Sequence, residues 1–183
     1  MRLTPGRVAW VVFLLAFIPG SAGAALEPGD TAVTTSVGFV DSPSGDFESD
    51  HGYEISLEYN KTSNVALRGA LGLYTLEGRA NSSPPGAGAI EVEGWVASGS
   101  LQWSPRLAML HPFLRAGAGL YNVHRTDDAG SSGGVEFGVH WGAGLDIQLL
   151  RHFALRGEAT FHYVTGDTAN PIIVYSVGGR FIF

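Results

Sequence analysis

Most of this chain alternates between apolar and polar residues along segments of about ten to fourteen residues, and this period constrains its fold more than any other feature. The last segment, 172–183, shows it clearly. Tyr175, Val177 and Phe181 share one face, whereas Arg180 lies on the other. Because successive side chains of a strand point to opposite faces, a period of two predicts a β-strand with one apolar and one polar face.

Eight such segments follow one another, separated by clusters of Gly, Ser, Asp, Asn and Pro. Glycines blur the alternation in the fourth and fifth segments, where a β-bulge would shift the parity. The pattern predicts an all-β fold, an eight-stranded antiparallel up-and-down barrel. The segments are 31–40, 51–60, 65–77, 90–103, 112–124, 135–149, 153–164 and 172–183.

The apolar faces favour a transmembrane barrel over a soluble one. A lipocalin-like barrel or a β-sandwich would use the same alternation but bury its apolar face. Here the polar faces are rich in glycine, and aromatic residues gather near the strand ends, as in the interfacial girdles of membrane barrels. The soluble folds stay open as an alternative. The expected girdle residues are Phe39, Tyr53, Tyr59, Trp103, Phe113, Phe137, Phe153 and Tyr163.

The first 24 residues read as a cleaved signal peptide. Two arginines precede an apolar run, Val8 to Ile18, and an Ala22-Gly23-Ala24 cleavage pattern follows. That run is too short for a spanning helix, which needs about 20 residues. We therefore expect residues 25–183 to form one exported domain.

Charge and cysteine content narrow the possible partners. The whole chain has 11 Lys+Arg and 17 Asp+Glu, and residues 1–24 hold two of the basic residues and no acid, so the domain carries a formal charge of −8. This balance excludes nucleic acid as an expected partner, since phosphate binding needs a basic surface. With no cysteine, neither a disulfide framework nor a thiolate zinc site is possible.

The connections alternate between long and short. The long ones are 41–50, 78–89, 125–134 and 165–171, and the others are 61–64, 104–111 and 150–152. In outer-membrane barrels long loops face the outside and short turns face the periplasm. With an even number of strands, both termini are then expected on the periplasmic side.

These features resemble the OmpA/OmpX-type family of small outer-membrane barrels. The glycine-aromatic segment 111–121 is similar to the central strands of that family, and the chain ends in Phe183. The resemblance implies an integral protein of the outer membrane, surrounded by its lipid and lipopolysaccharide. It also implies that the barrel-assembly machinery reads the last strand through Tyr175, Val177, Phe181 and Phe183.

The inward faces carry charges at similar depths. Several lie three to five residues from the expected periplasmic end of their strands, and the short turns bring Glu58 near Arg68 and Asp146 near Arg156. An eight-stranded barrel is normally filled by side chains, so we expect an ion network that plugs the lumen. A narrow ion path is the alternative. The network residues are Glu54, Glu58, Arg68, Arg115, Asp146, Arg156, Glu158 and Arg180.

No catalytic, cofactor or metal site is expected. His162 in the segment 161–167 lies on the inward face without a Ser/His/acid arrangement, and His51, His124 and His140 lack ligand spacing and are expected to be structural or solvent-facing. We expect a non-enzymatic protein that supports the envelope or binds an extracellular ligand through loops 41–50, 78–89 and 125–134. An outer-leaflet lipid A acylase or deacylase and a small-solute pore remain the alternatives.

Overall fold

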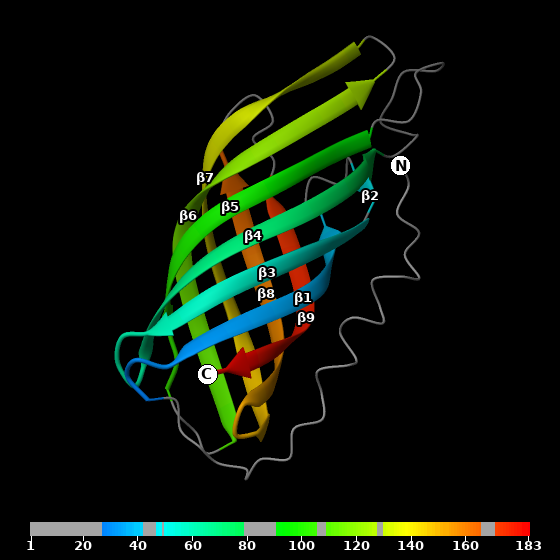
Figure 1. Cartoon of the computed structure of the whole chain (residues 1–183). Coiled ribbons are helices and arrows are strands. Elements are labelled where there is room, and N and C mark those ends of the chain that lie inside the picture. The colour runs from blue at the N-terminus through cyan, green and yellow to red at the C-terminus, as the bar shows by residue number, and fades with distance from the viewer. Residues whose placement is uncertain are drawn as a thin grey trace.

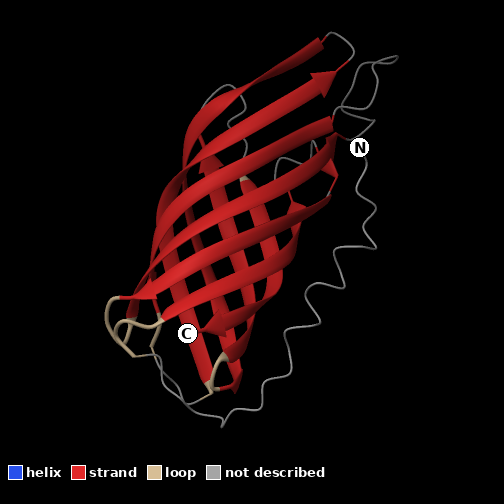
Figure 2. Ribbon diagram, viewed as in Figure 1, coloured by secondary structure: helices blue, strands red, loops and turns tan. Residues whose placement is uncertain are grey.

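The computed structural model describes residues 27–41, 47–48, 50–78, 91–105, 109–127, 130–165 and 171–183. Within these ranges eight long antiparallel strands close into one barrel (Figures 1 and 2). Each strand pairs with its neighbour in the chain, and the first pairs with the last, so the ring has no open edge. The prediction of an eight-stranded up-and-down barrel is confirmed.

The strand bounds lie close to the predicted segments. A two-residue strand, β2 (Phe47–Glu48), pairs with the last two residues of β4, Glu77 and Gly78. The wall consists of β1 (Thr31–Asp41), β3 (Asp50–Asn60), β4 (Val65–Gly78), β5 (Glu91–Trp103), β6 (Leu110–Asp127), β7 (Gly130–Leu150), β8 (Phe153–Val164) and β9 (Ile172–Ile182). The described part of the chain has no helix long and apolar enough to cross a membrane.

We call the end that holds Thr31 and Ile182 the terminal end, and the opposite end the distal end. The wall is highest at the distal end on the side of β6 and β7, where their hairpin extends beyond β8 (Figure 1). The segment 125–134 was expected to be a loop, and this was wrong, because the two strands pair as far as Asp127 and Gly130. Gly and Ser weaken a strand, but pairing with adjacent strands overrides that preference.

The polarity of the barrel is inverted relative to a soluble protein. Along β3 and β8 the exposed and buried positions alternate, with the charged residues inside. Large apolar side chains point outward, among them Phe39, Leu57, Leu71, Trp141 and Phe183. This outward apolar wall suits a lipid environment.

Two expectations about parity were wrong. The register between β5 and β6 is continuous, so there is no bulge there, and the irregularity lies between Gln148 and Leu150 at the end of β7. Phe113 is not a girdle residue but is buried inside the lumen. Phe113 shares the parity of Arg115, which was assigned to the lumen, and its aromatic ring near a strand end was wrongly taken as part of the girdle.

Inward glycines allow the backbones and side chains to pack closely. A Cβ on Gly117 would lie 2.2 Å from the carbonyl oxygen of Gly99, whereas a Cβ on Gly99 would meet nothing within 4 Å. Gly117 points into the crowded interior, and Gly99 faces the open outer wall.

This contrast predicts opposite outcomes for two neighbouring glycines. We expect Gly117→Ala to destabilise the barrel by about 1–3 kcal/mol, the usual cost of overpacking. The matched change Gly99→Ala should be neutral or stabilise the strand by up to about 1 kcal/mol. Urea titration in lipid vesicles, followed by heat-modifiable gel mobility, measures both. Equal effects of the two changes would contradict the assignment of their faces.

Candidate functional site in the barrel lumen

The eight predicted network residues lie inside the barrel. They come from β3, β4, β6, β7, β8 and β9, each at an inward position of its strand. Seven of them are at most 7% exposed, and the side chain of Glu54 is 12% exposed. The lumen therefore holds four arginines and four carboxylates away from bulk water.

Glu58 and Asp146 form the half of this network nearer the terminal end. Glu58 contacts Arg156 and accepts a 2.8 Å hydrogen bond from Nη2 of Arg180. Arg156 also binds Asp146 through two parallel hydrogen bonds, Nε–Oδ1 at 2.7 Å and Nη2–Oδ2 at 2.8 Å. Such bidentate pairs are the strongest and most directional ion pairs in proteins.

Glu158 and Glu54 form the second half. Glu158 accepts a 3.0 Å hydrogen bond from Nη1 of Arg68 and contacts Arg115, and Thr160 donates to it at 2.9 Å. Arg68 also contacts Glu54. The two halves are joined through Arg68, whose Nε lies 3.9 Å from Oε1 of Glu58.

The balance of charge explains how this interior is tolerated. Burying a charge is costly unless an opposite charge and hydrogen bonds compensate the lost water. Each of the four arginines has a carboxylate partner, and Arg156 also lies over the Phe113 ring, 4.5 Å from its centroid. The network spans the lumen, because its members come from opposite walls as well as from adjacent strands.

A layer of aromatic, imidazole and apolar side chains lies on the distal side of the charges. Val40 packs with Val174, and Val96 packs with Val164 and Tyr121, while Tyr74 contacts both groups. His140 and His162 lie directly opposite each other on β7 and β8. The phenol of Tyr121 and Nδ1 of His162 are 2.8 Å apart.

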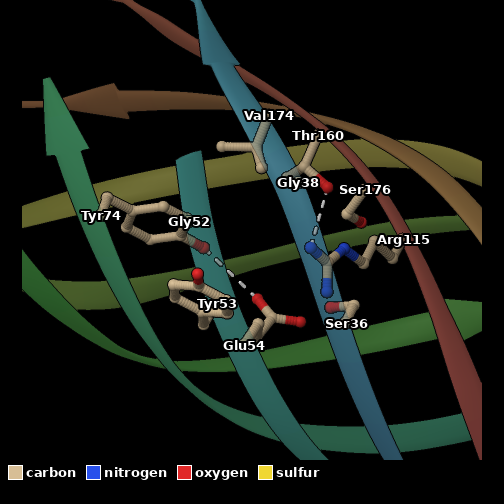
Figure 3. A pocket seen from close by; sticks show the side chains of 10 residues that line it. All are labelled: Ser36, Gly38, Gly52, Tyr53, Glu54, Tyr74, Arg115, Thr160, Val174 and Ser176. Atoms are coloured by element: carbon tan, nitrogen blue, oxygen red, sulfur yellow. Dashed lines mark hydrogen bonds between the residues drawn. The ribbon is translucent and has the colours of Figure 1, made fainter. Parts of the chain in front are cut away.

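Two small cavities flank the network. One, of about 10 Å³, lies on the distal side and is lined by Glu54, Tyr74, Arg115, Thr160 and other inward residues (Figure 3). The other, also about 10 Å³, lies near the terminal end beside Asn60, Gln102, His111 and Asp146. Each is about the size of one water molecule.

Sequence reasoning missed the distal layer, and for one histidine it left two positions open. His140 was expected to be structural or solvent-facing, and it is only 2% exposed. It has the same parity as Asp146 on β7, so the structural reading applies and the solvent-facing one does not. His51 is on the outer face and half exposed. Within the described part of the chain, no three His, Cys, Asp or Glu side chains converge as a metal-binding group.

The described residues give little support to an outer-leaflet enzyme. His162 is buried in the lumen on Tyr121, away from the lipid-facing wall. His51 on the outer face, in contact with Asp50 next to it in the strand, is the nearest described arrangement to a His/acid dyad. The hydroxyl of Thr75 beside it donates to the backbone carbonyl of His51 at 3.1 Å, so it is not placed as a nucleophile on the ring.

Several predictions fall outside the described residues. The expected signal peptide, residues 1–24, is one of them, as is nearly all of loop 78–89. Loop 41–50 is described at Asp41, at 47–48 and at Asp50. The outward positions of the last strand are described, and Tyr175, Val177 and Phe183 are each more than half exposed there.

Residues 10–181 match the profile of a family described as Outer membrane protein beta-barrel domain. No curated protein matches the chain. Solved structures with a similar fold include the N-terminal β-barrel domain of OprF from Pseudomonas aeruginosa, with 17% identity, a TM-score of 0.59, and coverage of 83% of this chain and 97% of that chain.

Two further structures have the same fold. Neisserial surface protein A has 14% identity and a TM-score of 0.62, covering 86% of this chain and 98% of that one. Ail, the attachment invasion locus protein of Yersinia pestis, has 12% identity and a TM-score of 0.56, covering 86% and 100%. Ail has also been solved with the heparin analogue sucrose octasulfate. At these identities the likeness shows the fold.

The geometry predicts that Glu58 is the most costly carboxylate of the lumen to neutralise. Among the described residues, Glu58→Gln leaves Arg180 with Asp146, 3.6 Å away, as its one carboxylate partner. We therefore expect the free energy of unfolding to fall by about 3–5 kcal/mol, typical of breaking a buried pair. Glu27→Gln, at an exposed position before β1, is the matched control and should cost nothing measurable. Urea unfolding of both variants in lipid vesicles measures these changes in the free energy of unfolding. A Glu58→Gln barrel as stable as the control would contradict the network.

Proposed function

This chain belongs to the outer membrane protein β-barrel domain family, and from that premise we propose that it is a non-enzymatic barrel with a closed lumen, acting through the surface that it shows outside the cell. Its place in the outer membrane follows from the fold and the family.

The observation that carries the proposal is the charged network across the lumen. Opposite charges from six strands neutralise one another in the interior, and the valine and tyrosine layer covers them on the distal side. The two flanking cavities are each about 10 Å³, room for one water molecule. Passage of a hydrated ion would require several of these ion pairs to separate at once.

We further propose that the distal end is extracellular and the terminal end periplasmic. At the terminal end, β3 and β4 are joined by residues 61–64, and β7 and β8 by residues 151–152. Short turns of this kind face the periplasm in bacterial outer-membrane barrels, and the longer connections face outside. The raised β6–β7 hairpin and the loops 41–50 and 78–89 would then form the surface available to an extracellular ligand.

The ligand class seen with Ail does not suit this chain. Sucrose octasulfate is a polyanion, whereas this chain has a formal charge of −6, and residues 41–50 contain Asp41, Asp46, Glu48 and Asp50. The negative charges of residues 41–50 would oppose the approach of a polyanion. A neutral or cationic surface ligand, or a purely structural role in the envelope, fits this charge better.

The alternatives carry less support. A lipid A acylase or deacylase would need a nucleophile within reach of its base on the lipid-facing wall. Among the described side chains, the one candidate dyad that we find is the outward His51 with its neighbour Asp50. A small-solute pore would need a path past the arginines of the lumen.

Export and assembly are proposed along with this role. We expect cleavage after Ala24 and recognition of Tyr175, Val177, Phe181 and Phe183 by the barrel-assembly machinery. Intact mass of the protein extracted from the outer membrane should correspond to residues 25–183.

Phe183→Ser and Tyr175→Ser should each lower the amount of heat-modifiable barrel in the outer-membrane fraction. The outward control Val135→Ser on β7 should not. Retention of residues 1–24, or normal assembly of both variants, would contradict this part.

Planar-bilayer recording tests the closed lumen. The wild-type barrel should show no stable conductance step above background. A variant that removes the central pairs, Glu58→Ala with Arg156→Ala, should conduct if it still shows heat-modifiable mobility. The outward variant Leu57→Ala, on the same strand as Glu58, is the control and should stay closed. A reproducible conductance of the wild type would favour the pore instead.

A further inference from the structure

Two histidines occupy directly opposed inward positions in the distal half of the lumen. His140 on β7 and His162 on β8 are partners in the strand register. Their ring centroids are 5.5 Å apart, with an angle of 35° between the rings. They are 2% and 4% exposed, so neither ring reaches bulk water.

Three of the four ring nitrogens have no hydrogen-bond partner among the described residues. Among the described residues, Nδ1 and Nε2 of His140 and Nε2 of His162 make no hydrogen bond, and all three are buried. A buried polar atom without a partner costs about 1–3 kcal/mol. The remaining nitrogen, Nδ1 of His162, contacts the Tyr121 phenol. The structural role of the network does not explain why three such atoms are kept in this layer.

We propose that His140 and His162 form a binding site for a divalent transition-metal ion of the type that prefers imidazole nitrogen, such as Cu²⁺, Ni²⁺ or Zn²⁺. Imidazole suits these ions, and Cu²⁺ is bound most tightly of the three by a given site. Two rings on one ion, with metal–nitrogen distances near 2.0–2.1 Å, place their centroids about 5 Å apart. The observed separation is close to that geometry.

The contact with Tyr121 prepares one ring for this role. When His162 carries its proton on Nδ1, that nitrogen donates to the Tyr121 hydroxyl oxygen and leaves the Nε2 lone pair free for a metal. A hydrogen bond that fixes the tautomer and orientation of a ligating histidine is a regular part of metal sites. Tyr121 is therefore a positioning residue, and it stays neutral in this arrangement.

The surroundings can complete the coordination. Tyr74, whose ring lies 6.1 Å from that of His162, lines the distal water-sized cavity together with Thr160 and Glu54. The cavity has room for about one water molecule, so one water oxygen would join the two imidazole nitrogens, and Cu²⁺ accepts mixed nitrogen and oxygen ligands. The positive charges nearest the site, Arg68 and Arg115, are each paired with Glu158, so they oppose a cation less than free arginines would.

Titration of the detergent-purified barrel with CuCl₂ tests the proposal. We expect one high-affinity equivalent by calorimetry, reversed by EDTA, and an electron paramagnetic resonance spectrum with splitting from two imidazole nitrogens. His140→Gln and His162→Gln should each abolish this equivalent. Tyr121→Phe should weaken it by about 10–100-fold, as expected for loss of an orienting hydrogen bond.

His51→Gln, at the outward and half-exposed histidine, is the matched control and should bind like the wild type. Each variant is first checked for heat-modifiable mobility. The spectrum of the wild type answers the question even if a lumen variant fails to fold. Absence of the high-affinity equivalent, a spectrum with fewer than two nitrogens, or equal loss of binding in His51→Gln would overturn the proposal.

Discussion

The closure of eight strands into a ring is the constraint on which the rest of this structure depends. A barrel of this size leaves an interior that side chains must fill, and its lipid-facing wall must be apolar. The charged side chains of the network therefore point into a space with little room for water. The chain meets this requirement with charges in matched numbers, and the bidentate pair of Arg156 with Asp146 shows how closely they are fitted. Each member is tolerated because its partners are present, so the interior behaves as one unit and not as a set of separate ion pairs.

The alternation along the strands made the fold and the inward position of these charges readable from the sequence. Parity assigns Glu58 and Arg180 to the face opposite the aromatic residues without any knowledge of the barrel. Tight turns also fix the register, and Glu58 lies opposite Arg68 in the ladder. The partners across the lumen could not be read in this way. Glu58 binds Arg156 and Arg180, which lie 98 and 122 residues away in the sequence. Closure of the barrel places β9 only one strand away from β3, and the narrow lumen brings Arg156 of β8 within reach.

The errors of sequence reasoning came from glycine and from local propensity. The Gly/Ser-rich segment 125–134 looked like a loop, yet most of it is strand, since the neighbouring strands supply hydrogen bonds that local preference does not predict. The inward position of Phe113 was missed for another reason. It has the same parity as Arg115, but an aromatic ring near a strand end is also what an interfacial girdle predicts. Farther along the same inward face lie Gly117 and Gly119. Glycines are needed there because the interior is crowded at those points.

The lumen is also graded along its axis, and this grading bears on its role. Asn60, Gln102 and His111 lie near the terminal end, the ion pairs lie at the middle, and valines with Tyr74 and Tyr121 lie toward the distal end. A water-filled channel would be expected to stay polar along its whole length, because each apolar stretch opposes wetting. In this barrel the apolar layer lies between the charges and the end with the longer connections. That order fits a closed interior, and a ligand would then bind at the distal end and not inside the lumen. It also makes the two histidines within the apolar layer stand out, since polar groups placed there have few protein partners.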